Sequence, residues 1–180
     1  MAISQKCKKV MLFLLKLLLL PVERVSHRLY MKFYLRILAA YGCNLKGTPR
    51  YIGYHVVFDD YKKITIGDRV VISDGCHLLT HDYSYTTALL AAGKAPESDI
   101  AIIRGIQIGN NVFIGKKTIL CPNTSIGNNC IIGAGSVIRG KIEDNSVVMG
   151  NPAIFVCNIK DLLERWDKKL TPEQIRHDKK

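Results

Sequence analysis

The residue best suited to acid–base chemistry is His81, in the string Leu79-Thr80-His81-Asp82-Tyr83. An imidazole with a pKa near 6.5 can accept a proton from a hydroxyl group near neutral pH. It serves as a base when a carboxylate or carbonyl on the other ring nitrogen holds its tautomer. Asp82, Asp60 and Glu97 are candidates for that carboxylate, although Glu97 has the setting of an ordinary solvated loop residue.

A six-residue repeat indicates which elements must position His81. Large aliphatic residues recur every six positions, and a small or medium side chain follows each of the first five by four positions. The aliphatic residues are Ile108, Ile114, Leu120, Ile126, Ile132 and Ile138, and the smaller ones are Val112, Thr118, Thr124, Cys130 and Ser136. An earlier block has the same rhythm, with Ile66, Ile72 and Leu78 followed by Val70 and Cys76.

This period excludes a helix, because six steps of about 100° end about 120° out of phase. In an extended chain, positions i+4 and i+6 share a face, so each repeat is a short strand with two inward side chains and a corner. The corners contain Gly109-Asn110-Asn111, Gly127-Asn128-Asn129 and Gly133-Ala134-Gly135, residues that tolerate positive φ. The sequence therefore predicts a coiled parallel β-solenoid.

The rhythm is interrupted between Asp82 and Gly105. Long excursions inside a compact domain are usually functional. His81 lies three positions after Leu78, the last residue in phase, and is therefore expected at a corner with its side chain outward. Phase alone does not say how much of the segment leaves the coil.

The segment GNNVFIGKKTILCPNTSIGNNCIIGAGSVI, followed by Gly150-Asn151-Pro152-Ala153, resembles the hexapeptide-repeat acyltransferases, in particular the sugar and polysaccharide O-acetyltransferases. The resemblance covers about Gly47 to Cys157. It implies an all-β fold, a left-handed parallel β-helix, and a homotrimer with active sites between subunits. The usual right-handed rule for parallel crossovers would give the opposite winding.

The resemblance also implies roles for residues of this chain. His81 matches the catalytic base, and Asp60 matches a residue that binds the acceptor sugar hydroxyls. Asp82 is a predicted catalytic residue because it is adjacent to His81 in sequence, and Tyr83 is a further predicted contact of the acceptor. Acetyl-CoA is the implied co-substrate, and no metal is expected. The residues expected along the coenzyme are Phe113, Lys116, Ala134, Arg139, Gly150, Asn151 and Pro152.

One departure from the family pattern concerns the coenzyme phosphates. Relatives commonly have a basic residue just after Asn-Pro-Ala, whereas Ile154, Phe155 and Val156 follow here. Lys160 or Arg139 could supply the missing charge.

The chain has a formal net charge of +11, and most of this charge belongs to the first fifty residues, where ten basic residues face Glu23 alone. Local basicity of this kind favours a surface-binding arm over a nucleic-acid-binding fold. Residues 1–46 are predicted to form a basic helical arm. The apolar run Val10–Val22 would span about 20 Å as a helix, whereas a bilayer core is about 30 Å thick.

A second helical pattern follows, with apolar residues on one face and Arg28, Lys32 and Arg36 on another. The apolar residues are Leu29, Tyr30, Phe33, Tyr34, Ile37, Leu38 and Tyr41, and Gly42 is a suitable stop. Residues 1–41 could lie on an anionic membrane or pack on protein, and the sequence leaves both open. No A-x-A-like cleavage site follows the apolar run, and the six cysteines are scattered. A cytoplasmic location is expected, with peripheral attachment to the inner face of the membrane as one alternative.

The remaining segments complete a division into 1–46, 47–157 with its excursion at 82–105, and 158–180. In the last segment Ile159, Leu162, Leu163 and Trp166 have helical spacing and are expected to cap the solenoid. Thr171-Pro172-Glu173 reads as a new helix start.

Other functions are less well supported. Gly115-Lys116 lacks P-loop spacing, and no histidine between His81 and His177 supplies the later ligands of a zinc hydrase. An acetyltransferase of serine or a free sugar, and a non-catalytic scaffold, remain alternatives to the expected transfer from acetyl-CoA to a saccharide hydroxyl.

Overall fold

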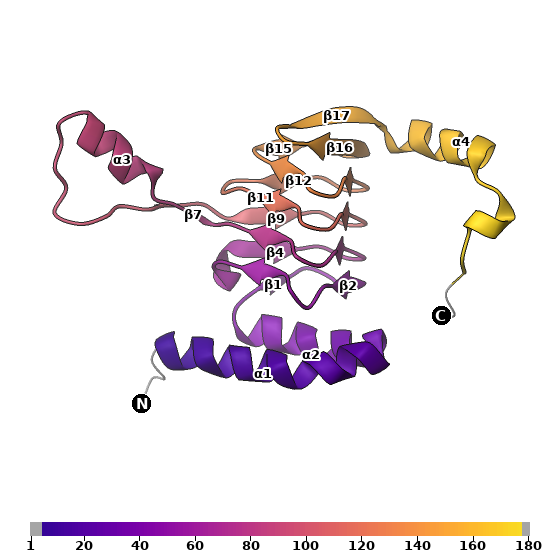
Figure 1. Ribbon diagram of the computed structural model, residues 1–180, viewed down its shortest axis with the longest axis horizontal. Helices are drawn as coiled ribbons and strands as arrows, with labels where there is room; N and C mark the ends of the chain where they lie inside the picture. The colour runs from indigo at the N-terminus through magenta and orange to yellow at the C-terminus, as the bar shows by residue number, and fades with distance from the viewer. Residues whose placement is uncertain (1–4, 178–180) are drawn as a thin grey trace.

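The computed structural model describes residues 5–177. Residues 1–4 and 178–180, at the ends of the expected arm and of the expected C-terminal segment, lie outside the described residues. Two helices, α1 (Gln5–Val25) and α2 (His27–Ala40), lie across one end of a column of stacked coils, and α4 (Ile159–Lys169) extends from the other end (Figure 1). Short 3-10 helices occur at Tyr61–Lys63 and Pro172–Gln174, and Thr171 caps the second as predicted.

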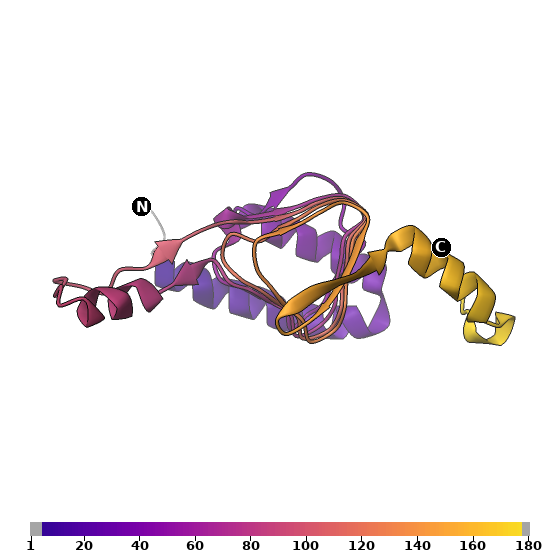
Figure 2. The ribbon, with the colours of Figure 1, turned by 90° about the horizontal axis from the view of Figure 1, so that it is seen from above.

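Three sheets form the sides of the column, and the coils have a three-cornered outline in Figure 2. The first sheet contains β1 (Asn44–Leu45), β4 (Ile64–Ile66), β9 (Ile106–Ile108), β12 (Ser125–Ile126) and β15 (Lys141–Ile142). The second contains β2 (Tyr51–Ile52), β5 (Val71–Ile72), β10 (Phe113–Ile114), β13 (Ile131–Ile132), β16 (Ser146–Gly150) and β17 (Ala153–Asn158). The third contains β3 (Val57–Phe58), β6 (His77–Leu78), β11 (Ile119–Leu120) and β14 (Val137–Ile138).

All strand pairs in these sheets are parallel except β16 with β17. In the regular coils, Ile108 pairs with Ile126, Ile114 with Ile132, and Leu120 with Ile138, so one coil takes three hexapeptide repeats. The chain thus forms the left-handed parallel β-helix implied by its hexapeptide pattern. The solenoid begins at Asn44, slightly before the expected boundary at Gly47.

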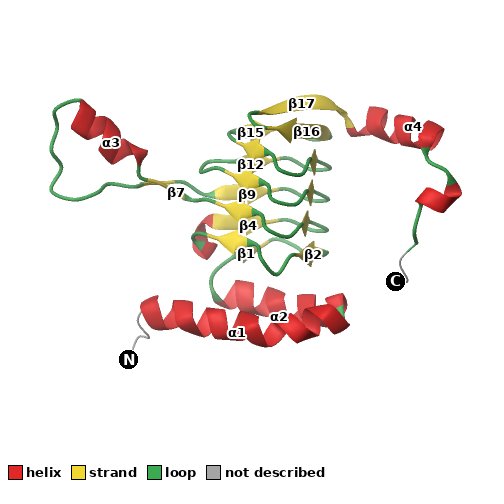
Figure 3. Ribbon diagram, viewed as in Figure 1, coloured by secondary structure: helices red, strands yellow, loops and turns green. Residues whose placement is uncertain are grey.

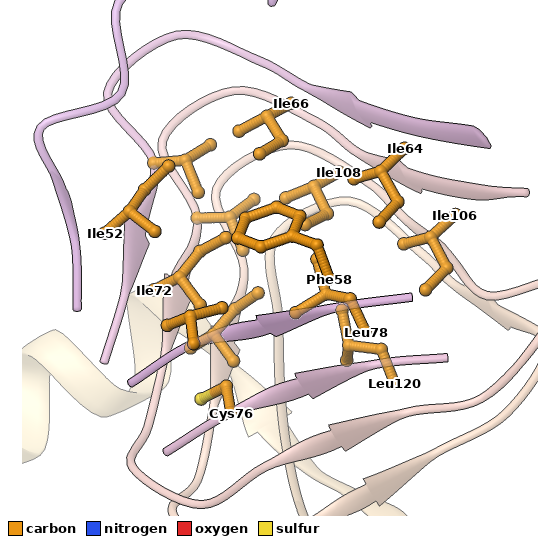
Figure 4. Packing of buried hydrophobic residues seen from close by; sticks show 14 of the residues in the cluster. Ile52, Phe58, Ile64, Ile66, Ile72, Cys76, Leu78, Ile106, Ile108 and Leu120 are labelled. Atoms are coloured by element: carbon orange, nitrogen blue, oxygen red, sulfur yellow. The ribbon is translucent and has the colours of Figure 1, made fainter. Parts of the chain in front are cut away.

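The repeated positions build the core, as predicted. All nine aliphatic repeat residues are buried, and so are the smaller side chains that follow them. Figure 4 shows the aliphatic side chains stacked inside the coils, with Ile66 beside Ile108 and Leu78 beside Leu120. The buried hydroxyls of Thr118, Thr124 and Ser136 each donate a hydrogen bond to the carbonyl three residues earlier, so these polar groups are satisfied.

The asparagine-rich corners also follow the prediction. Asn111 and Asn129 adopt φ values of 53° and 55°. Their side chains form a ladder along one edge, because Asn111 Nδ2 donates to Asn129 Oδ1 at 2.9 Å and Asn129 Nδ2 donates to Asn145 Oδ1 at 3.1 Å. Asparagine both tolerates this backbone region and bonds to the equivalent residue in the next coil.

The excursion leaves the column between the third and first sheets (Figure 3). It consists of β7 (His81–Asp82), α3 (Ser84–Ala91) and β8 (Ile102–Ile103), and β7 pairs with β8 in antiparallel fashion. Leu78 pairs with Leu120, seven repeat lengths later, whereas regular partners are separated by three. The excursion therefore adds four whole repeat lengths, and the register of the coils is undisturbed.

One face of α2 packs on the first coil, with Tyr30, Tyr34 and Leu38 fully buried. The Tyr30 hydroxyl donates to the Ile52 carbonyl at 3.0 Å, and the Ile52 N–H donates to Met31 Sδ at 3.2 Å. For α2, the interpretation in which the inner face packs on the body is therefore confirmed. Gly42, with φ of 95°, ends the helix as expected.

The expected C-terminal helix forms, but its predicted capping role is wrong for the single chain. None of the residues of α4 is buried, and the helix projects away from the column (Figures 1 and 2). The strand β17 instead pairs along the free edge of β16. The apolar spacing of Leu163 and Trp166 predicted the helix correctly but did not identify its packing partner.

Two tyrosines of α2 provide a matched test of this packing. Among the described residues, no group hydrogen-bonds to the buried Tyr34 hydroxyl, in contrast to that of Tyr30. Tyr30→Phe should lower the free energy of unfolding by about 1–3 kcal/mol, because it leaves the buried Ile52 carbonyl without this donor. Tyr34→Phe should leave the free energy of unfolding unchanged or raise it. Urea unfolding of both variants measures the difference, and equal losses would contradict the assignment.

Candidate active site

His81 begins the excursion, at the point where the chain leaves the third sheet. Its backbone lies opposite Ile103 in the antiparallel ribbon, and the Arg104 N–H donates to the Thr80 carbonyl at 2.9 Å. The His81 side chain is 27% exposed. The ring is thus held between the column and the base of the ribbon while remaining open to solvent.

The carboxylate beside His81 belongs to Asp59. Its Oδ2 lies 2.8 Å from His81 Nδ1, and it also accepts hydrogen bonds from the backbone N–H groups of Thr80 at 3.0 Å and His81 at 3.1 Å. The assignment of this contact to Asp82 or Asp60 is therefore wrong. The coil between β3 and β6 is slightly longer than a regular coil, as Phe58 pairs with Leu78, and this stacking puts Asp59 next to the chain entering the excursion.

Asp59 remains ionised and fixes the histidine tautomer. Burial raises the pKa of the Asp59 carboxyl, but the hydrogen bonds from the His81 ring and from the Thr80 and His81 backbone outweigh it together and hold the pKa below its usual value. An ionised Asp59 accepts the proton of Nδ1 and leaves the lone pair on Nε2. This arrangement suits a general base.

The other predicted residues around His81 have different contacts. Asp82 Oδ1 accepts the Ser84 N–H at 2.9 Å, and the Ser84 hydrogen bonds, with Arg139 and Arg104 nearby, lower the pKa of this exposed carboxyl. Asp60 caps the 3-10 helix by accepting the Lys62 N–H at 3.0 Å.

Two further predicted residues of the excursion face solvent. Tyr83, which precedes α3, is exposed, and so is Glu97 in the return loop. Among the described residues, the hydrogen-bond partners of the His81 ring are Thr80 and Asp59.

The residues expected along the coenzyme are divided between two parts of the column. Arg139 lines a shallow pocket of about 140 Å³ with Asn151 and Pro152, near the C-terminal end. Gly150 precedes this turn and donates its N–H to Ser136 Oγ at 3.1 Å.

The second group lies away from the His81 edge. Phe113 is exposed on the second sheet, and Lys116 and Ala134 occupy stacked corners between the second and third sheets. Successive coils approach each other closely at these corners. A Cβ atom added at Gly115 would lie only 2.4 Å from the Ala134 nitrogen. A single chain does not gather all seven residues at one site.

A second histidine–carboxylate pair, which the sequence did not predict, lies at the corner between the second and third sheets. His55 Nδ1 lies 2.8 Å from Asp74 Oδ2, and the His55 N–H donates to Asp74 Oδ1 at 2.7 Å. Burial raises the pKa of Asp74, but the His55 hydrogen bonds and the nearby Lys116 outweigh it. The longer first coil again explains the pairing, because Gly53 packs directly against Asp74.

Residues 5–177 contain neither a group of three or more side chains able to hold a metal ion nor a helix long and apolar enough to cross a bilayer.

Comparison with known proteins agrees with this geometry. Residues 105–140 match the family model described as bacterial transferase hexapeptide (six repeats). The chain is 32% identical over 123 residues to a galactoside O-acetyltransferase of Escherichia coli, covering 68% of this chain and 58% of the relative. It is 26% identical over 110 residues to a putative lipopolysaccharide biosynthesis O-acetyl transferase of the same bacterium, covering 59% and 56%.

A probable acetyltransferase of Mycobacterium tuberculosis is 34% identical over 108 residues, covering 59% of this chain and 34% of the relative. The chain therefore spans between about a third and three fifths of the length of these curated relatives.

Two solved structures share the fold. A galactoside acetyltransferase in complex with coenzyme A has a TM-score of 0.62 at 22% identity, covering 87% of this chain and 83% of that one. A hexapeptide-repeat-containing acetyltransferase from Vibrio cholerae, complexed with acetyl coenzyme A, has a TM-score of 0.60 at 19% identity, covering 88% and 91%. With its six-residue period, its three-sided coil and its similarity to these relatives, the chain belongs to the hexapeptide-repeat acyltransferase family.

Proposed function

We propose that the protein transfers an acetyl group from acetyl-CoA to a hydroxyl of a saccharide, with His81 as the general base. The observation that carries this proposal is the His81–Asp59 pair. The register of the coils fixes the His81 ring nitrogen and the His81 backbone N–H against the Asp59 carboxylate. The names of the relatives, a galactoside O-acetyltransferase and a putative lipopolysaccharide biosynthesis O-acetyl transferase, support the reaction class and the saccharide acceptor.

The transfer needs one proton to move twice. His81 Nε2 accepts the acceptor hydroxyl proton as the oxygen attacks the thioester carbonyl, and the Asp59 carboxylate stabilises the imidazolium that forms. When the tetrahedral intermediate collapses, the C–S bond breaks and the imidazolium returns the proton to the coenzyme sulfur. The products are an acetyl ester and free CoA.

The coenzyme is proposed to bind between subunits of a homotrimer. The resemblance to hexapeptide acyltransferases implies this arrangement, and the division of the predicted residues between two parts of one chain supports it. Arg139, Asn151 and Pro152 would come from one subunit, while Phe113, Lys116 and Ala134 would come from its neighbour. Gly150 would support the turn at Asn151.

The acceptor is proposed to enter beside the excursion. Tyr83 presents an exposed ring two residues from His81, a geometry suited to packing against a sugar face. Asp60 offers its carboxylate one residue from Asp59, with Oδ1 also engaged by Lys62. These two residues are the proposed contacts of the acceptor hydroxyls.

Calorimetric titration with acetyl-CoA, free CoA and a longer acyl-CoA tests the donor without an acceptor. We expect saturable binding near one site per chain, and Arg139→Ala should weaken it by about tenfold or more through loss of a charge-assisted contact. Lys168→Ala, which removes an exposed charge on α4, is the control. Absence of binding to the folded protein would favour the scaffold alternative.

The base is tested by the rate of thiol release from acetyl-CoA with a panel of saccharides and with serine. His81→Ala should lower kcat by about 10²–10⁴-fold. Asp59→Asn should lower kcat by about tenfold or more because the tautomer is no longer held, whereas Asp82→Asn should retain most of the rate. A folded His81→Ala variant with nearly full activity would refute the mechanism, and turnover of serine alone would identify a soluble acceptor.

A further inference from the structure

The helical hairpin formed by α1 and α2 presents an apolar surface on the side away from the column. Large side chains there are between 41% and 70% exposed, and we call them the outer apolar face: Val10, Leu14, Leu17, Leu18, Leu29 and Phe33. Figures 1 and 2 show both helices lying across the end of the column, transverse to its axis. The outer apolar face therefore covers the base of the molecule rather than a groove in it.

The orientation of α1 is fixed by the one charged residue within its apolar run. Lys16 points toward the coils, where its Nζ lies 3.4 Å from the Val56 carbonyl and 5.5 Å and 5.3 Å from the ring centroids of Tyr34 and Tyr54. Leu19, on the same side of the helix, is buried. The opposite side of α1 consequently has no charge between Val10 and Leu18.

The charges that remain around this surface are basic. Glu23, the only acidic residue among the first fifty, turns inward and accepts a hydrogen bond from the Tyr51 hydroxyl at 2.7 Å. Arg24 is exposed at the end of α1, and Lys32 and Arg36 are exposed on α2, opposite its buried tyrosines. An apolar face with a basic border is complementary to an anionic lipid surface, whereas a second copy would oppose like charges.

We propose that the outer apolar face of the α1–α2 hairpin docks on an anionic lipid bilayer, with the helices lying in the interface. Neither helix is long and apolar enough to cross a bilayer, so the mode is interfacial. This inference uses no residue of the catalytic site. If the proposed function also holds, His81, which follows the second strand of the third sheet, acts close to the lipid and favours an acceptor carried on it.

Vesicle flotation of the full chain tests the proposal. We expect binding to vesicles of phosphatidylcholine with phosphatidylglycerol, weaker binding to phosphatidylcholine alone, and release as salt is raised. Leu14→Gln/Leu18→Gln should weaken binding by about tenfold or more. Arg24→Glu/Lys32→Glu should weaken it by about 30-fold or more, since each of the two basic residues contributes about 1 kcal/mol.

The control is Leu90→Gln/Leu163→Gln, which alters leucines of similar exposure, 57% and 55%, on α3 and α4. It should bind vesicles like the parent chain, as should His81→Ala, which separates lipid docking from catalysis. Circular dichroism and acetyl-CoA titration verify folding of the variants. Absence of binding to anionic vesicles, or equal loss in the control, would overturn the proposal. So would a lower oligomeric mass of the Leu14/Leu18 variant in sedimentation, which would assign the face to a protein contact.

Discussion

The register between stacked coils is the constraint on which the rest of the structure depends. Parallel strands bond in fixed register, so each inward side chain must sit directly on its equivalent in the next coil. Ile114 and Ile132 illustrate the result, with both side chains fully buried. A shift by one residue would turn every apolar side chain outward and every polar one inward. The six-residue period satisfies this constraint, because it places an equivalent side chain at each paired position.

The His81–Asp59 pair depends on the same register. Asp59 and His81 are 22 residues apart along the chain and belong to different secondary-structure elements. They meet because β3 stacks under β6, and four donors from Thr80 and His81 then converge on one carboxylate oxygen. Since two of these donors are backbone groups, the position of the carboxylate is tied to the sheet itself. Rigid support of this kind is what a base needs if its tautomer is to stay fixed.

Periodicity predicted the repeated core, the corners and the two terminal helical regions, because each depends on local spacing. It missed Asp59 and the His55–Asp74 pair, since the first coils are slightly longer than the three repeats of a regular coil. A count based on the regular period therefore aligns the wrong residues across the corner. The packing of α4 was also beyond the sequence, because the apolar spacing of Leu163 and Trp166 does not specify a partner. The length of the insertion became countable only from the strand pairing.

The side chains of α2 have a consequence for the size of the molecule. A stack of equivalent coils has no intrinsic length, and a bare terminal strand is a template for further growth. At one end Tyr30 and Met31 occupy the free N–H and carbonyl of Ile52, and at the other β17 runs against the direction of the stack. A helix and a reversed strand thus close both ends of the second sheet, where a bare strand would otherwise offer its edge to a further coil.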